Sequence, residues 1–420
     1  MNTAGPLITE DDKLRLIANI NAAFTPGAPI NSRDLFAGRS KEVEKAIGTI
    51  FQPGQHSVIY GERGVGKTSL ANTLFDVLVN MGKANYQTAK LTCSEAMNFA
   101  HIWRGIFRQL RGKDENIDLA TTLGDDPHSE NVREVFQAVA DPSIVIIDEF
   151  DRINDTTVHT ALADTIKTLS DNAINTTLIM VGVADSLIEL LKEHLSIIRS
   201  IREIPMQRMS KAELLGIIDK GMNHCHGLSI VQPAKERIAD YSQGLPSITH
   251  LLAREAGLEA VRSFRTVITM SDLERAIVEA VDSQSEFLLE AYRSAVSAPR
   301  GIHFKPVLLA CAVAAKDDHG FFYAKDVTEP LRLISHKPNF NIPAFAFHLK
   351  AFCSESRGKI LEKRGRRLRF VQPIMGPYVI LRGLADRLIT EPQLSHPPIT
   401  STVPEQLSLL PPSSVPAIEF

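Results

Sequence analysis

The sequence contains little cysteine and no export signal pattern. Four cysteines occur in 420 residues, and none has the CxxC spacing of metal or redox centres. The first residues, MNTAGPLITEDDK, lack the basic-then-apolar order of a secretory leader. These absences predict a reduced, cytoplasmic protein without a disulfide framework. The cysteines are Cys93, Cys225, Cys311 and Cys353.

Long apolar runs and a large excess of one charge are also missing. Apolar stretches such as Val307–Ala315 are much shorter than the roughly 20 residues that cross a membrane as a helix. The formal net charge of −3 excludes a polycation that coats nucleic acid, so any such contact needs a local basic patch. A chain of 420 residues with 44% hydrophobic residues is expected to form two or three domains.

Between residues 33 and 205, short apolar runs alternate with helical periods. This order predicts an α/β core with a parallel sheet covered on both faces. Residues 1–32 form a lead-in segment, with a helix expected over Asp12–Ala23. The expected strands are His56–Tyr60, Tyr86–Leu91, Ser143–Asp148, Thr177–Val183 and Ile201–Met206.

The pattern changes three times after the core. Residues 206–285 are helical in period, and Ser210 followed by Glu213 is a capping box at the start of this predicted lid. Residues 290–388 predict a winged helix, with a helix over Ala344–Cys353 and a hairpin of Ile360–Lys363 and Leu368–Val371. Residues 389–420 are rich in proline and serine and predict a disordered tail.

The strongest motif is the P-loop Gly61-Glu-Arg-Gly-Val-Gly-Lys-Thr68, which follows an apolar strand and precedes a helical stretch. Its glycines let successive backbone N–H groups face phosphate oxygens, and the helix N-terminus favours the anion. We expect Lys67 to contact the β- and γ-phosphates of ATP and Thr68 to bind Mg²⁺. The predicted nucleotide-binding residues here are Gly61, Gly64, Val65, Gly66, Lys67, Thr68 and Ser69.

A second motif is the apolar run Ser143–Ile147 followed by Asp148 and Glu149. A buried strand that ends in two acids delivers carboxylates to the sheet edge where α/β proteins bind ligands. We expect Asp148 to complete the Mg²⁺ site and Glu149 to polarise the attacking water. The alternative is that both acids simply begin the next loop.

These motifs and the stretch Leu35–Glu42 resemble the AAA+ ATPases of the origin-recognition and cell-division-control type. Leu35-Phe-Ala-Gly-Arg-Ser-Lys-Glu42 is similar to the "GR-x-x-E" box of that family, and signalling ATPases of the STAND type and transposition-helper ATPases share it. The resemblance implies that Gly38 and Arg39 lie against the adenine. A plain helix entrance with a surface arginine is the alternative.

The same resemblance implies roles for three further residues. Asp185 stands where the family has its sensor-1 polar residue, although an asparagine is more usual, and a loop cap is the alternative. Arg199 lies in a region similar to the arginine finger, which acts on a neighbouring subunit, and is preferred to Arg202; a plain surface arginine is the alternative. The stretch Gly244-Leu-Pro-Ser247 stands where the family usually has its sensor-2 arginine motif. It resembles the STAND and transposition-helper lineages instead, whose proline, here Pro246, packs near the nucleotide.

A basic patch covers residues 357–369, with Glu362 as its one acid. Alternation in Arg367-Leu-Arg-Phe370 predicts a strand with its basic side chains on one face. Such a hairpin could lie along the phosphate backbone of double-stranded DNA without reading its sequence. A solvated edge strand protected by charge is the alternative. The cations are Arg357, Lys359, Lys363, Arg364, Arg366, Arg367 and Arg369.

Together these patterns predict an ATP- and Mg²⁺-dependent AAA+ molecular switch that forms a homo-oligomer and acts on DNA with a protein partner. The predicted catalytic residues are Lys67, Glu149 and Arg199. The alternative is a STAND-like signalling or antiviral-defence regulator, whose winged helix contacts protein rather than DNA.

Overall fold

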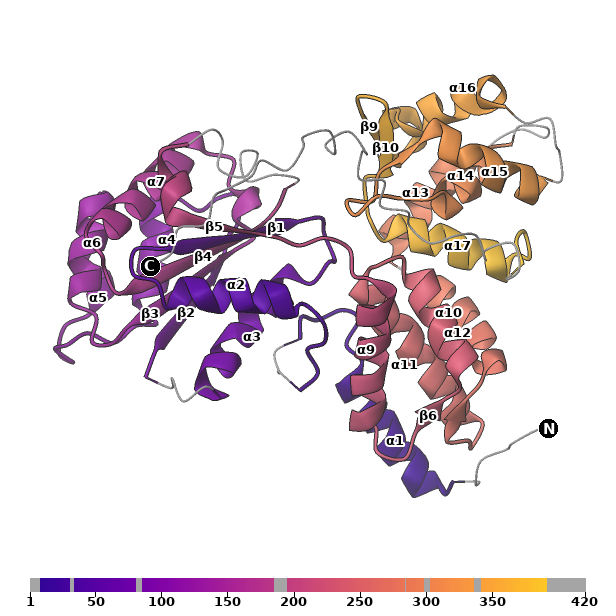
Figure 1. The fold of residues 1–420 in the computed structure, drawn as a ribbon, viewed down its shortest axis with the longest axis horizontal. Coiled ribbons are helices and arrows are strands. Elements are labelled where there is room, and N and C mark those ends of the chain that lie inside the picture. Colours follow the sequence, from indigo (N-terminus) through magenta and orange to yellow (C-terminus); the bar gives the residue numbers. More distant parts are fainter. Residues whose placement is uncertain are drawn as a thin grey trace, which may run out of the picture.

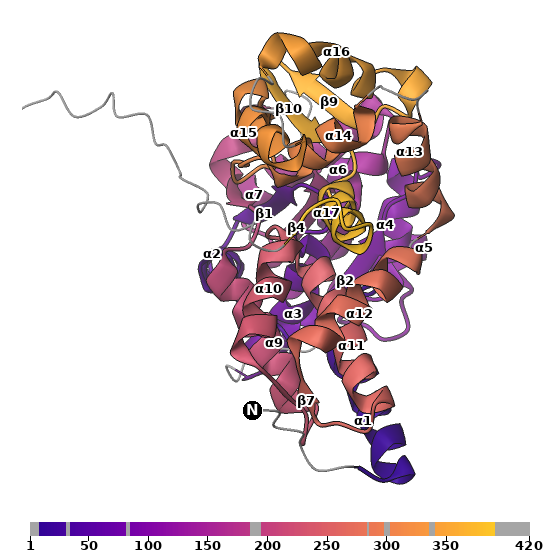
Figure 2. The ribbon, with the colours of Figure 1, turned by 90° about the vertical axis from the view of Figure 1, so that its right-hand side faces the viewer.

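The computed structural model describes residues 8–30, 34–80, 85–184, 195–283, 285–297, 303–335 and 341–390. The chain forms an α/β core on one side, with a helical lid and a C-terminal unit stacked on the other side (Figure 1). The N-terminal helix α1 (Glu10–Ala23) lies among the lid helices rather than beside the core (Figure 2). No described helix combines the length and apolar character needed to cross a membrane.

A parallel sheet organises the core. Within the described residues its five strands have the order β2-β3-β4-β1-β5, and every neighbouring pair is parallel. The predicted strands are therefore confirmed, with bounds shifted by a residue or so, and β2 occupies the edge beside β3. The strands are β1 His56–Gly61, β2 Gln87–Thr92, β3 Ser143–Asp148, β4 Thr176–Val183 and β5 Ile201–Pro205.

Alternate residues of the central strands enter different hydrophobic clusters on the two faces of the sheet. Val145 and Ile147 pack into a cluster that contains Trp103, whereas Ile144 and Ile146 pack on the opposite side. Because both faces of these strands are buried, their sequences are continuous apolar runs rather than alternating apolar and polar residues. The helices of the core are α2 Ser40–Ile50, α3 Lys67–Asn80, α4 Phe99–Phe107, α5 Leu119–Thr122, α6 Ser129–Gln137 and α7 Thr156–Asp171, with short 3-10 turns η1 Phe150–Arg152 and η2 Leu195–Ser200.

Residues 206–285, the predicted lid, are mostly helical, and the lead-in helix α1 packs against them; their role as a lid stays a prediction. The capping box of Ser210 and Glu213 is present at the start of α9, with Glu213 N–H donating to Ser210 Oγ at 3.3 Å. Helix α1 packs against α9 and α11, where a Cβ at Gly221 would lie 2.2 Å from the Phe24 ring. The elements are α1 Glu10–Ala23, α9 Lys211–His224, β6 Ser229–Ile230, α10 Gln232–Ser242, α11 Pro246–Arg262, β7 Val267–Ile268 and α12 Met270–Asp282.

The C-terminal unit combines helices with a small antiparallel sheet of order β8-β10-β9. The predicted alternation on β10 is confirmed, because Leu368 and Phe370 are buried while Arg367 and Arg369 are partly exposed. The elements are α13 Glu286–Val296, α14 Phe304–Val313, β8 Phe322–Tyr323, α15 Ala324–Ser335, α16 Ile342–Phe352, η3 Glu355–Arg357, β9 Leu361–Arg364, β10 Arg367–Phe370 and α17 Met375–Ala385.

The last helix, α17, joins the lid to the C-terminal unit by packing on both α12 and α14. Ile389, which follows it, is only 3% exposed and belongs to the hydrophobic core. The predicted start of a disordered tail at residue 389 is therefore wrong, because an apolar side chain there is buried. Residues 391–420, which carry the rest of that prediction, lie outside the described residues.

Candidate functional site

The P-loop connects β1 to α3 and has a backbone that requires glycine at its first position. Gly61 has φ +152°, and a Cβ there would lie 2.2 Å from the main-chain oxygen of Met206 in the segment after β5. Gly64 and Gly66 also have positive φ, at +87° and +96°. The loop therefore turns tightly beside the neighbouring chain and leads into the N-terminus of α3.

Lys67, the first residue of α3, folds back over this loop. Its Nζ donates to the main-chain oxygens of Gly61 at 3.0 Å and Glu62 at 2.8 Å. The residue is only 8% exposed, and burial lowers the pKa of its ammonium group to about 8, although the nearby Asp151 and Asp148 oppose this shift. A buried cation held by two carbonyls is placed to exchange them for phosphate oxygens.

The predicted metal-binding pair comes together at the carboxyl ends of the strands. Thr68 Oγ1 donates to Asp148 Oδ1 at 3.3 Å, and the same oxygen accepts the N–H of Glu149 at 2.9 Å. Lys90 Nζ lies 3.3 Å from the other oxygen of Asp148. A hydroxyl and a carboxylate are the hard oxygen donors that suit Mg²⁺, which commonly takes only one or two protein ligands beside phosphates. No cluster of three or more His, Cys, Asp or Glu suited to a metal occurs among the residues described.

Glu149 directly follows the strand and has a left-handed backbone, with φ +54°. Its carboxylate is 45% exposed and accepts a hydrogen bond from Arg152 Nη1 at 2.9 Å. Both residues line the same cavity as Lys67. An exposed ion pair of this kind is weak, so the carboxylate can leave it at small cost.

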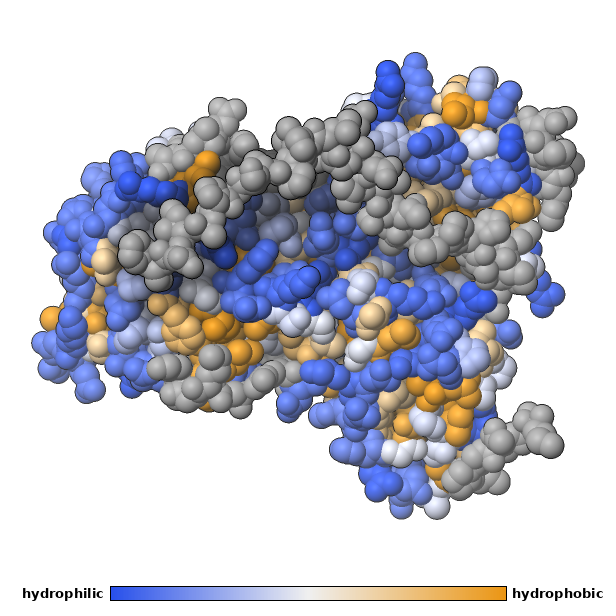
Figure 3. Space-filling view, viewed as in Figure 1, coloured by the Kyte–Doolittle hydropathy of each residue, from blue (hydrophilic) through white to orange (hydrophobic). Residues whose placement is uncertain are grey.

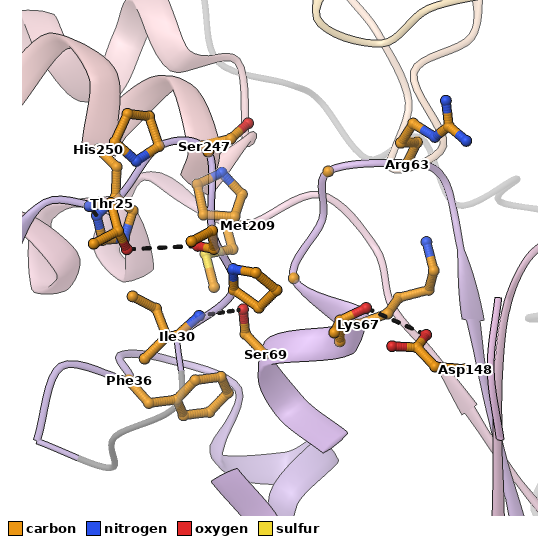
Figure 4. Close-up of a pocket in the computed structure, with 18 of the residues that line it drawn as sticks. Thr25, Ile30, Phe36, Arg63, Lys67, Ser69, Asp148, Met209, Ser247 and His250 are labelled. Atoms are coloured by element: carbon orange, nitrogen blue, oxygen red, sulfur yellow. Dashed lines mark hydrogen bonds between the residues drawn. The ribbon is translucent and has the colours of Figure 1, made fainter. Parts of the chain in front are cut away.

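These side chains line one end of a cavity of about 390 Å³ between the core and the lid (Figure 4). Lys67 and Asp148 lie at the polar end, while Phe36, Ile30 and Met209 gather at the apolar end. A polar end that binds phosphate and an apolar end that takes a flat base is the arrangement a nucleotide needs. The other predicted residues that line the cavity are Gly64, Gly66, Thr68, Ser69, Glu149 and Pro246.

Sequence reasoning missed much of the apolar end. Residues 25–30 close it from the lead-in segment, where Ile30 N–H donates to Ser69 Oγ at 3.0 Å (Figure 4). Thr25 N–H donates to Nδ1 of His250 at 3.3 Å, and burial lowers the pKa of this histidine to about 4. The turn-rich TPGAPI was a usable signal, because such a segment before a P-loop can fold over the ligand. The remaining missed lining residues are Leu35, Phe36, Ala37, Arg63, Asp151, Arg152, Gly182, Val183, Met209, Ile217 and Ser247.

Gly38 and Arg39 lie behind the cavity wall rather than in it. Arg39 is 3% exposed, and its Nη2 donates to the carbonyls of Val65 at 3.1 Å and Gln207. Its own N–H donates to Glu213 Oε1 at 3.1 Å, and a Cβ at Gly38 would lie 2.9 Å from that oxygen. The described contacts thus make this box a brace between P-loop, core and lid, and the adenine contact stays a prediction.

Pro246 and Ser247 begin α11 and face the P-loop. A Cβ at Gly66 would lie 3.9 Å from Pro246 Cγ, and a Cβ at Gly64 would lie 3.7 Å from Ser247 Oγ. The start of this lid helix therefore covers the phosphate end of the cavity. The packing of Pro246 near the nucleotide itself stays a prediction.

Three more of the predicted residues that the structure describes, Gly61, Val65 and Arg199, do not line this cavity. Arg199 is 72% exposed at its side chain and pairs with Asp171 at 2.6 Å, at the end of α7. A finger acting on a neighbouring subunit has to be exposed in this way, so its role stays a prediction. Asp185 lies outside the described residues.

The basic patch is largely occupied by internal contacts. Arg357 donates to the carbonyls of Ala295 at 3.0 Å and Ser297 at 2.7 Å and lies over the ring of Phe304. Its guanidinium therefore supports α13 and α14, and a contact of Arg357 with DNA stays a prediction. Of the other cations, Lys359 pairs with Glu355, Arg367 with Asp317, and Arg369 and Arg364 with Glu362.

Lys363 and Arg366, at the hairpin tip, are exposed and have no ion pair among the described residues. A second cavity, of about 200 Å³, separates the other side of this hairpin from the P-loop. Arg364 and Arg369 line it from the C-terminal unit, and Glu62 and Arg63 line it from the core. Hydrophilic residues predominate on the face of the molecule where these two parts meet (Figure 3).

Comparison with known proteins agrees with this fold. Residues 52–191 match a family model described as an AAA domain. A Walker-type ATPase of Pyrococcus abyssi is 15% identical, with a TM-score of 0.50, over 84% of this chain and 98% of that one. Cdc6p of Pyrobaculum aerophilum is also 15% identical, with a TM-score of 0.46, over 88% and 99%. Comparison with curated proteins gives no match. At such identity the likeness establishes the fold alone, which is that of the P-loop AAA+ ATPases.

Proposed function

We propose that this protein is an ATP-binding and ATP-hydrolysing AAA+ molecular switch. The observation that carries the proposal is the convergence of Lys67, Thr68, Asp148 and Glu149 at one end of a cavity that is apolar at its other end. Asp148 ends β3 and Glu149 follows it, whereas Lys67 and Thr68 begin the helix that follows β1. These two parallel strands are separated by β4, and their carboxyl ends share one edge of the sheet. The same edge carries the helix N-terminus that favours a phosphate.

In this proposal each side chain has a distinct task. Lys67 exchanges the carbonyls of Gly61 and Glu62 for the β- and γ-phosphate oxygens. Thr68 and Asp148 hold Mg²⁺, which would neutralise charge on the phosphates when bound. Glu149 leaves Arg152 and accepts a proton from, or orients, the attacking water. The start of α11, with Pro246, closes over the loop and excludes solvent.

We further propose that residues 33–205 are the ATPase core, 206–285 with α1 the lid, and 290–388 a winged helix. The element order α14, β8, α15, α16, β9, β10 and the sheet order β8-β10-β9 support the last assignment. Arg199 would act on a neighbouring subunit in a cytoplasmic homo-oligomer, because in this chain it lies away from the chain's own cavity. Nothing in these assignments requires a particular number of subunits.

The DNA contact is proposed for the hairpin tip alone. Lys363, near the end of β9, and Arg366, in the turn that follows it, are exposed cations, and such residues bind phosphates without reading bases. Two cations predict weak, salt-sensitive binding, so a partner protein would have to supply specificity. Replacing both with alanine should reduce the slope of log affinity against log salt concentration by the amount expected for about two phosphate contacts.

The test is ATP turnover by the full chain at several protein concentrations, with and without double-stranded DNA. We expect turnover in the wild type, little nucleotide binding in Lys67→Ala, and nucleotide binding with about 10²- to 10⁴-fold slower turnover in Glu149→Gln. Stimulation by DNA should disappear in Lys363→Ala/Arg366→Ala and persist in Lys359→Ala, which removes a paired cation. Unchanged turnover in both Lys67→Ala and Glu149→Gln would refute the ATPase proposal.

The second cavity favours one other candidate, a STAND-like signalling or defence regulator. Arg364 and Arg369 of the hairpin face the P-loop across it, so part of the basic strand is directed at the core rather than at solvent. In such a switch the C-terminal unit would stabilise the resting state by packing on the core. Its release from the core would expose a protein-binding surface. If DNA changes neither ATP turnover nor oligomerisation at any salt concentration, this candidate is favoured.

A further inference from the structure

Arg208 lies where the core, the lid and the C-terminal unit meet. Its guanidinium donates to both carboxylate oxygens of Glu62, with Nη2 to Oε2 at 3.1 Å, and Nη1 donates to the main-chain oxygen of Gln243 at 3.2 Å. Glu62 belongs to the P-loop, and Gln243 caps the C-terminus of α10 in the lid. The side chains of Arg208 and Glu62 are only 9% and 8% exposed.

The same residue contacts a turn of the C-terminal unit. Arg208 N–H donates to the main-chain oxygen of Asp318 at 3.2 Å, and a Cβ at Gly320 would lie 2.6 Å from Arg208 Nη2. Asp317 fixes this turn by accepting the N–H groups of His319 and Phe321. The other oxygen of Asp317 accepts from Arg367 Nη1 at 3.2 Å, so the turn is also tied to β10.

Glu62 connects Arg208 to the residue that would bind phosphate. Its side chain holds Arg208, while its main-chain oxygen accepts Nζ of Lys67 at 2.8 Å. A buried two-pronged ion pair has a fixed geometry, and loss of either partner leaves the other charge buried without compensation. A shift of the Glu62 backbone therefore has to move the Arg208 guanidinium with it.

We propose that Arg208 is a positioning residue that couples the conformation of the P-loop to the turn at residues 317–321 of the C-terminal unit. When Lys67 leaves the Glu62 carbonyl for a phosphate, the loop is released from one of its contacts and the ion pair transmits its new position. By reciprocity, a ligand that moves the C-terminal unit alters the nucleotide affinity. This inference rests on the proposed nucleotide site, but it does not require turnover.

The experiment is hydrogen exchange of the full chain with and without Mg²⁺ and a non-hydrolysable ATP analogue. In the wild type, saturating analogue should change exchange at the amides of residues 318–321 by roughly fivefold or more. Arg208→Lys keeps the positive charge but cannot make the two-pronged bond to Glu62. This variant should still bind the analogue, but the analogue should no longer change hydrogen exchange at residues 318–321. Arg265→Lys is the matched control, because Arg265 makes a two-pronged bond to the buried Asp272 entirely within the lid.

Glu62→Gln breaks the same ion pair from the P-loop side and should give the same loss, with melting curves showing that both variants are folded. An analogue-induced change that survives in both variants, or its absence in the wild type despite binding, overturns the proposal. A role that is only structural would lower the melting midpoint and leave the transmitted change intact. If the wild type binds the analogue and transmits the change but never turns ATP over, the ATPase proposal fails and this one stands.

Discussion

The carboxylate of Glu149 is held by Arg152, three residues later, at 2.9 Å in an ion pair that is about half exposed on both sides. The ion pair joins the candidate base, which caps the 3-10 turn η1, to an arginine of that turn, and both residues line the candidate nucleotide cavity. The carboxylate oxygen that accepts the hydrogen bond of Arg152 has to give up this bond before it can hold the attacking water. The pair is therefore a restraint on Glu149 that has to be relieved before the proposed reaction.

Arg152→Ala should raise kcat, because it removes this restraint. An exposed pair contributes about 0.2–1 kcal/mol, so the increase should be at most about fivefold, with little change in nucleotide affinity. Arg332→Ala is the matched control, since Arg332 makes a comparably exposed pair with Glu329 at the same spacing. Steady-state ATP turnover measures kcat for both variants. A fall in kcat in Arg152→Ala would show instead that Arg152 supports the reaction.

Nucleotide affinity should weaken as the pH rises through about 8. Burial lowers the pKa of Lys67 to about 8 in the free protein, so its ammonium group is present below this pH and is lost above it. Bound phosphates favour the charged form, and the apparent affinity should fall by up to about tenfold per pH unit above the free value. Titration of a fluorescent ATP analogue between pH 6.5 and 9.5 measures this.

Lys67→Arg supplies the control for that titration, because guanidinium remains protonated throughout the range. The Lys67→Arg variant is expected to bind the ATP analogue more weakly than the wild type, with an affinity that does not change with pH. A wild-type affinity that is also flat would mean that the free ammonium group keeps its ordinary pKa.

Gly221→Ala should destabilise the lid and weaken nucleotide binding together. The added Cβ would meet the ring of Phe24 at 2.2 Å, and this buried ring anchors the chain that continues into residues 25–30 of the cavity wall. Overpacking of this kind costs about 1–3 kcal/mol. Thermal unfolding and analogue binding should both report the change.

Gly216→Ala, in the same helix α9, is its control. There the nearest atom to an added Cβ is Ala37 Cβ at 4.0 Å, so alanine should stabilise the helix by up to about 1 kcal/mol. Equal effects of the two substitutions would contradict the proposed anchoring by Phe24.

Arg199→Ala should abolish most turnover without affecting nucleotide binding, because Arg199 is exposed and lies outside the chain's own cavity. If it acts on a neighbour, a mixture of Arg199→Ala and Glu149→Gln chains should recover part of the wild-type rate. An interface at which a Glu149→Gln chain supplies its Arg199 to the site of an Arg199→Ala chain then combines both intact residues. No recovery on mixing, with both variants still assembled, would exclude the action between subunits.

Local sequence was sufficient for the core and for the phosphate end of the site. The run Ser143–Asp148 is a strand over those residues, and the P-loop spacing places Lys67 and Thr68 at the start of α3, because each depends on residues close in the chain. The capping box of Ser210 and Glu213 was predictable for the same reason. Parallel strands then bring their carboxyl ends to one edge, which unites Thr68 with Asp148 across 80 positions.

Only the tertiary structure decided which surfaces meet. The packing of α1 on the lid places residues 25–30 against Ser69, and no periodicity in the sequence specifies that contact. The patch at residues 357–369 was predicted as one basic surface of seven cations, but Arg357 supports two helices and Arg367 holds a turn, since buried or half-buried charges need partners. The ion pair between Glu62 and Arg208 joins residues 146 positions apart through the folding of three units, so its existence could not be read from either motif.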